Sequence, residues 1–181
     1  MNNIEINGLK FEILISSEEI LNKINFLAQQ LKDTYRDDWP VCLIVLNGAA
    51  VFASELLQHL ESSVEVSLVK VKSYDGMKTS GEILIEYLPY SIIKNKKVLL
   101  IEDIVDTGLT LNFLKKELKK HGAKKVECVT LLFKPTKYNY NIMPDYIGFY
   151  IGDEFVVGYG MDFYETGRDL KNIYKNIIHQ N

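Results

Sequence analysis

The chain has 181 residues, 47% of them hydrophobic, and a formal net charge of −3. This length and apolar content predict one globular domain, residues 1–181, with a substantial core. Sequence-independent binding of nucleic acid needs a basic face, so the slightly acidic balance argues against it. No apolar run approaches the ~20 residues that would span a bilayer, so no membrane contact is expected.

Two further features predict a cytoplasmic protein. Cys42 and Cys128 lie in apolar runs without metal-ligand spacing, which predicts buried free thiols in a reducing compartment. Residues 1–13 lack the basic segment and following apolar segment of a signal peptide.

The first half of the chain alternates between strand patterns and helix patterns. A short strand is expected at residues 11–15, and Ser16 with Glu19 has the form of a capping box. Apolar residues at helical spacing then predict a helix. The expected elements that follow are a helix at 17–35, a strand at 41–46, a turn at 47–49, a helix at 50–60 and a strand at 64–72.

The second half continues this alternation after a polar, glycine-containing segment at residues 73–82. A strand is expected from Ile83, another at 98–101, and a helix that stops with Gly122 at its C-cap position. The remaining expected elements are strands at 126–133, 146–151 and 155–159, and a closing helix through Leu170, Ile173, Tyr174 and Ile177. Strands that alternate with helices predict an α/β fold with a mainly parallel, twisted sheet flanked by helices.

Residues 98–110, VLLIEDIVDTGLT, carry the most informative pattern. Four apolar residues predict a strand buried on both faces, and Glu102 and Asp103 follow near its end. Asp106 then opens a turn, residues 107–110, ahead of a helix. Ligands of open α/β sheets bind beyond the carboxyl ends of the strands, and the free N–H groups of a helix N-terminus favour a phosphate. The sequence therefore predicts a site for a phosphorylated sugar.

This motif resembles the phosphoribosyl-pyrophosphate signature of type I phosphoribosyltransferases. Three other segments resemble the hypoxanthine branch of that family: residues 155–162 with 168–170, Ser73-Tyr74, and residues 132–134. The resemblance implies the family's sheet with a small hood formed by the N- and C-terminal segments. It also implies a purine salvage transferase that converts hypoxanthine, and guanine, with 5-phosphoribosyl 1-pyrophosphate into IMP, GMP and pyrophosphate.

The resemblance assigns roles to individual residues. Asp106 corresponds to the residue beside purine N7, where a general base contributes ~10²–10⁴-fold, although an N-cap of the following helix is an equally compatible role. The phosphoribosyl group would contact Glu102, Asp103, Thr107, Gly108, Leu109 and Thr110. Pyrophosphate would contact Leu46, Asn47, Gly48 and Arg168. The purine would contact Lys134, Phe155, Val156 and Asp162.

Two further assignments concern the cofactor and a loop. Mg²⁺, which prefers oxygen ligands, would be held by Glu102, Asp103 and Asp162. Ser73 and Tyr74 would lie in a mobile loop, residues 73–82, that closes over the site. The family also implies a homodimer or homotetramer.

Lys134 is expected to set the choice of purine. An ammonium group can donate to a 6-oxo group but finds only another donor on a 6-amino purine, so hypoxanthine and guanine are favoured over adenine. Ordinary structural roles compete with these assignments: a surface lysine at 134, a core aromatic at Phe155, and a weak surface ion pair between Asp162 and Arg168.

The sequence departs from the family pattern at two positions. Many members carry a basic residue where Asn47 stands, so pyrophosphate binding here is expected to depend on main-chain amides, Mg²⁺ and Arg168. The bond between Leu46 and Asn47 is expected to be cis. Leu109 stands where a lysine or arginine is frequent, so this side chain either faces away from the phosphate or leaves its site less positive.

Three other functions remain open. A related transferase could prefer xanthine or guanine. A regulator of the same fold could sense 5-phosphoribosyl 1-pyrophosphate and bind RNA, although it would need a basic face. A phosphoacceptor receiver domain also places acids at strand ends, but it has no use for the turn at 107–110.

Overall fold

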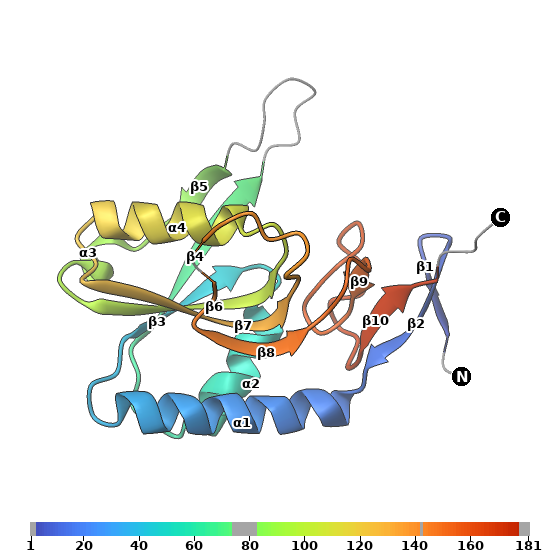
Figure 1. Cartoon of the computed structure of the whole chain (residues 1–181), viewed down its shortest axis with the longest axis horizontal. Coiled ribbons are helices and arrows are strands. Elements are labelled where there is room, and N and C mark those ends of the chain that lie inside the picture. Colours follow the sequence, from blue (N-terminus) through green and yellow to red (C-terminus); the bar gives the residue numbers. More distant parts are fainter. Residues whose placement is uncertain (1–2, 74–82, 142, 178–181) are drawn as a thin grey trace.

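The computed structural model describes residues 3–73, 83–141 and 143–177, and their largest unit is a six-stranded sheet (Figure 1). Its strands, in spatial order, are β5 (Ile83–Tyr87), β4 (Val66–Ser73), β3 (Val41–Leu46), β6 (Lys97–Val105), β7 (Lys125–Phe133) and β8 (Tyr146–Tyr150). All neighbouring pairs are parallel except β4 and β5. The predicted mainly parallel α/β sheet is confirmed.

Helices cover both faces of this sheet (Figure 1). On one face lie α1 (Ser17–Tyr35) and α2 (Ala50–Leu60), and on the other lie α3 (Tyr90–Ile93) and α4 (Leu109–Lys120). A hydrophobic core lies on each face of the sheet, and alternate residues of β6 pack into one or the other. Leu99 packs on the α1 and α2 side, and Leu100 packs on the α4 side. Because side chains alternate along a strand, Glu102 and Asp103 leave β6 on opposite faces.

The ends of two helices follow the predicted local signals. Ser16 and Glu19 form the capping box, with the Glu19 N–H donating to Ser16 Oγ at 3.3 Å and the Ser16 N–H donating to Glu19 Oε2 at 2.9 Å. At the end of α4 the C-cap is His121, and Gly122 follows it with φ +90°. Glycine is needed at this next position because the backbone there is left-handed.

A smaller antiparallel sheet forms the hood predicted from the N- and C-terminal segments. Its strands, in spatial order, are β1 (Ile4–Ile6), β2 (Leu9–Ile15), β10 (Ile173–Asn176) and β9 (Val156–Val157). The predicted closing helix is wrong, since β10 occupies this part of the chain. The pairing of β10 with β2 shifts register between Ile173 and Tyr174, and both residues are buried. Two consecutive buried residues disguise the two-residue period of a strand.

Two smaller expectations were also tested. Cys42 and Cys128 are buried free thiols, as predicted. Of the helices within the described ranges, none is both long enough and apolar enough to cross a bilayer.

Candidate active site

Three cavities open where β3, β6 and β7 end, between the start of α4 and the hood. We call them the small cavity, about 100 Å³, the middle cavity, about 210 Å³, and the large cavity, about 450 Å³. Asp103 and Asp162 line both the middle and the large cavity, and Asp106 lines both the small and the middle cavity. These shared carboxylates join the three cavities into one site.

The small cavity is built on the start of α4. It is lined by Glu102 and residues 104–111. The N-cap of α4 is Gly108, with φ +82°, and no side chain caps the helix. Asp106 is therefore not the helix cap, which was one of its two predicted roles. The Leu109 N–H donates to Thr107 Oγ1 at 3.4 Å. The amides that follow it in the first turn can bind an anion, and the helix dipole favours one.

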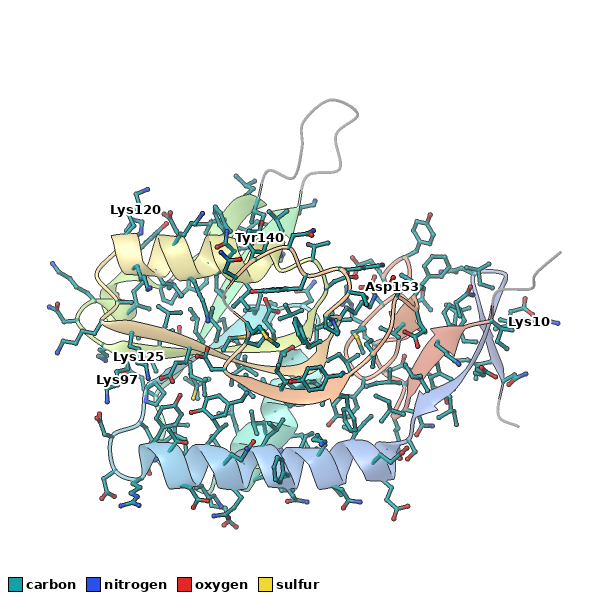
Figure 2. The ribbon with its side chains drawn as sticks, viewed as in Figure 1. Lys10, Lys97, Lys120, Lys125, Tyr140 and Asp153 are labelled. Atoms are coloured by element: carbon teal, nitrogen blue, oxygen red, sulfur yellow. The ribbon has the colours of Figure 1, made fainter. Side chains whose placement is uncertain are left out.

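Two tyrosines that sequence reasoning missed lie against this turn. A Cβ added to Gly108 would lie 2.2 Å from the Tyr138 ring and 2.9 Å from the Tyr140 ring. The Asn139 N–H also donates to the Thr107 carbonyl at 3.3 Å. Figure 2 shows Tyr140 beside the start of α4. The segment after β7 thus packs against the turn that lines the small cavity, and no motif marks it in the sequence.

The middle cavity brings together all four residues that were predicted to contact the purine. Its lining consists of Asp103, Ile104, Asp106, Lys134, Phe155, Val156, Met161 and Asp162. Lys134 is only 3% exposed, so it is not a surface lysine. Phe155 is 46% exposed and is therefore not a core aromatic.

An ion pair between the buried Lys134 and the partly exposed Asp106 forms one wall of the middle cavity. Lys134 Nζ donates to Asp106 Oδ2 at 2.9 Å, and the Lys134 N–H donates to the Val105 carbonyl at 3.0 Å. Asp106 Oδ1 is buried and has no hydrogen-bond partner among the described residues. Buried acceptors without a partner are rare in folded proteins and often belong to functional sites.

The large cavity contains the predicted pyrophosphate turn. Its lining consists of Leu46, Asn47, Gly48, Lys70, Val71, Lys72, Glu86, Asp103, Asp162, Glu165 and Arg168. The Leu46–Asn47 bond is cis, as expected. Gly48 is required where the turn passes Asp103, because an added Cβ would lie 1.8 Å from Asp103 Oδ2.

Lys70, Lys72 and Glu86 were missed from the sequence. They reach the large cavity because β4 lies beside β3 with Leu46 opposite Lys70, and β5 lies beside β4. The alternating Val-Lys-Val-Lys pattern of residues 69–72 was a usable signal. The pattern alone does not show that these lysines reach the site, because that depends on β4 lying beside β3. Tyr74 lies outside the described residues, as do residues 75–82, and Ser73 ends β4.

Arg168 is held in a network of carboxylates. Its Nη2 lies 2.8 Å from Asp162 Oδ1 and 2.9 Å from Glu165 Oε2, and Nη1 donates to the Gly160 carbonyl at 3.0 Å. The Asp162–Arg168 pair therefore exists. It lines the large cavity with both side chains 28% exposed, so it is not a fully solvated surface pair.

The two adjacent carboxylates of β6 have different surroundings. Glu102 faces the small cavity, and burial together with the neighbouring Asp103 raises the pKa of its carboxyl well above the ordinary value. Burial raises the pKa of Asp103 to about 6, although the Arg168 guanidinium acts in the opposite direction. Within the described part of the chain, no three acidic, histidine or cysteine side chains gather closely enough to hold a metal on their own.

Comparison with known proteins decides the family. The model of the phosphoribosyl transferase domain matches residues 14–164. The chain belongs to the phosphoribosyltransferase family. This phosphoribosyltransferase is 38% identical over 163 residues to a hypoxanthine-guanine phosphoribosyltransferase of Bacillus subtilis, covering 90% of this chain and 91% of the relative. It is 41% identical to the protein of that name from Lactococcus lactis, with 88% and 87% of the two chains covered.

Solved structures agree with these relatives. A hypoxanthine phosphoribosyltransferase from Staphylococcus aureus matches this phosphoribosyltransferase with a TM-score of 0.86 at 38% identity, over 92% of this chain and 91% of the other. One from Trypanosoma cruzi in complex with the product IMP matches with a TM-score of 0.85 at 30% identity, over 98% and 100% of the two chains.

Proposed function

We propose that this phosphoribosyltransferase transfers the 5-phosphoribosyl group of 5-phosphoribosyl 1-pyrophosphate to hypoxanthine, and to guanine, in purine salvage. The observation that carries the proposal is the ion pair of the buried Lys134 with Asp106 on the wall of the middle cavity. Relatives named hypoxanthine-guanine phosphoribosyltransferase support it. A regulator that only senses the sugar phosphate would have no need for a purine-facing cation and carboxylate held together.

Lys134 selects the purine by its remaining donors. An ammonium has three N–H groups, and one of them donates to Asp106. Another can donate to the 6-oxo group of hypoxanthine or guanine. A 6-amino group would leave two donors facing each other in a buried place, which costs binding free energy. Phe155 offers an exposed ring on which a flat base can stack.

Asp106 moves the purine proton. In the reaction, the bond between the ribose anomeric carbon and pyrophosphate breaks, and a bond from purine N9 forms at the same carbon. A purine that carries its proton on N7 must lose it as N9 is alkylated. Asp106 accepts this proton, and Lys134 orients the carboxylate through Oδ2.

The three cavities divide the rest of the substrate. The amides at the start of α4 bind the 5′-phosphate in the small cavity, and the turn at Asn47 faces pyrophosphate in the large cavity. Asp103 and Asp162 line the large cavity together, and two carboxylates with substrate oxygens and waters suit Mg²⁺. Bound Mg²⁺ would neutralise charge on the leaving pyrophosphate. We expect the enzyme to act in the cytoplasm as a homodimer or homotetramer.

An assay with four bases tests the proposal. The purified protein is given 5-phosphoribosyl 1-pyrophosphate, Mg²⁺ and either hypoxanthine, guanine, xanthine or adenine, and nucleotide formation is followed by absorbance. Turnover of hypoxanthine and guanine is expected. Preference for xanthine would favour the neighbouring specificity, and turnover of adenine alone would contradict the role of Lys134.

A further inference from the structure

The large cavity has more acidic than basic side chains, and most of its cations are already paired. Lys70, Lys72 and Arg168 face four carboxylates, those of Glu86, Asp103, Asp162 and Glu165. Lys70 Nζ lies 2.7 Å from Glu86 Oε2, and Arg168 is held by Asp162 and Glu165. Among the ion pairs of the described residues, Lys72 takes part in none. Of the basic side chains that line this cavity within the described ranges, only Lys72 has no carboxylate partner.

Strand pairing directs Lys72 toward the Asn47 turn. Leu46, the last residue of β3, lies opposite Lys70 of the parallel strand β4. Residues of a strand advance by about 3.3 Å each, so Lys72 lies two residues beyond the end of β3, level with the turn that follows it. The turn itself carries no charge, since its residues are Asn47, Gly48 and Ala49.

From these observations, and resting on the proposed function, we propose that Lys72 binds the pyrophosphate group of the substrate and supplies the positive charge that the Asn47 turn lacks. An ammonium on a flexible stem forms charge-assisted hydrogen bonds with phosphate oxygens, which are stronger than those of main-chain amides alone. The site therefore takes its cation from the neighbouring strand.

Glu86 keeps the other lysine of β4, Lys70, in an ion pair. The pKa of the Glu86 carboxyl is lowered chiefly by its hydrogen bond to Lys70, and the more weakly interacting Lys72 ammonium acts in the same direction. Glu86 thus stays ionised and occupies Lys70 rather than Lys72. Removing the Glu86 charge frees the Lys70 ammonium for the same anion.

Calorimetric titration with pyrophosphate and Mg²⁺ tests the role of Lys72, because it measures binding without turnover. Lys72→Gln is expected to raise the Kd for pyrophosphate roughly five- to tenfold, as the loss of one charge-assisted hydrogen bond does. Lys72→Arg keeps the charge and retains most of the affinity. Glu86→Gln is expected to lower the Kd about twofold. The Kd for IMP, which has no pyrophosphate, stays unchanged in all three variants.

Lys10→Gln is the matched control. It removes the same charge from an exposed strand position in the hood, at the far end of the molecule (Figure 2), so it reports any effect of net charge alone. A Lys72→Gln protein that binds pyrophosphate within twofold of the wild type, or a wild-type protein that does not bind it, overturns the assignment. Failure of the wild type to form IMP while pyrophosphate binding still depends on Lys72 would instead refute the proposed function and leave the assignment standing.

Discussion

In the proposed function the small and the large cavity each bind a phosphate group, but the two cavities are built differently. The small cavity consists of one continuous segment at the start of α4 with its main-chain amides, and Glu102 and Asp106 are the only charged residues in its lining among those that the structure describes. The large cavity uses charged side chains that arrive from β4, β5, β6 and the segment at 162–168. The first is a local structure, and the second exists only when the sheet and the hood are assembled.

Because of this difference, the two cavities are sensitive to different kinds of substitution. An amide cradle is fixed by backbone geometry, so it depends on Gly108 and on the tyrosines that pack against it. A cavity of ion pairs depends on the balance of charge, so substitutions of its charged side chains change its affinity more than its shape. IMP binding distinguishes the two cavities, since IMP carries the 5′-phosphate but no pyrophosphate.

Asp106→Asn has the largest expected effect and leaves both cavities intact. The amide is nearly the same shape but is a poor proton acceptor, so kcat for IMP formation is expected to fall by roughly 10²–10⁴-fold. The Kd values for IMP and for pyrophosphate, measured by calorimetry, stay within about threefold because neither phosphate site depends on this proton transfer. A variant that keeps turnover within twofold rules out the general base.

Gly108→Ala breaks the small cavity. The new methyl group would lie 2.2 Å from the Tyr138 ring, at a residue whose φ is +82°. Strain of this kind costs on the order of 1–3 kcal/mol, which lowers the melting temperature. The Kd for IMP is expected to rise at least tenfold.

Gly122→Ala is the control for this strain. Its φ is +90°, but the nearest atom to an added Cβ is Lys94 Cγ at 3.5 Å, and it lies at the other end of α4. It is expected to lower the melting temperature while leaving IMP binding unchanged. Equal weakening of IMP binding in both variants would show that general destabilisation, not the cradle, is responsible.

Gly48→Ala tests the large cavity. The added methyl group would displace the Asp103 carboxylate, which lies 1.8 Å from its position. The KM for 5-phosphoribosyl 1-pyrophosphate is expected to rise roughly tenfold, about 1.4 kcal/mol of binding free energy, with a smaller rise in the Kd for IMP. Gly152→Ala is the control, because its methyl group also meets a carboxylate, Glu154 Oε2 at 2.7 Å, outside the large cavity. If Gly48→Ala raises the Kd for IMP more than the KM for 5-phosphoribosyl 1-pyrophosphate, the proposed division of roles between the two cavities is wrong.

The same contrast explains what the sequence could predict. The amide cradle, the capping box at Ser16 and the buried strand at 98–101 depend on neighbours in the chain, and all three were predicted. Lys70 and Lys72 were missed because their meaning depends on β4 lying beside β3. Tyr138 and Tyr140 were missed because nothing in a loop sequence indicates where its rings will pack.

The hairpin of β1 and β2 was also missed, although the sequence contains a signal for it. Asn7 and Gly8 both have positive φ in the tight turn between β1 and β2, and Asn-Gly between apolar residues is a strong hairpin signal. The closing strand β10 was hidden by its irregular register with β2. Strand order and register come from tertiary packing, so a pattern within ten residues cannot contain them.

Leu109→Lys has the smallest expected effect and asks whether the cradle gains from charge. Leu109 is half-buried at the first position of α4 and lines the small cavity, so an ammonium there can approach the 5′-phosphate. A partly solvated ion pair is worth roughly 0.2–1 kcal/mol, so the Kd for IMP is expected to fall about two- to threefold at low salt. The gain shrinks in 0.5 M salt, because salt screens exposed charges. Leu109→Met, which keeps the apolar character, is expected to bind IMP like the wild type at both salt concentrations. If Leu109→Lys weakens IMP binding instead, the lysine competes with the amides for space, and the cradle works by shape more than by charge.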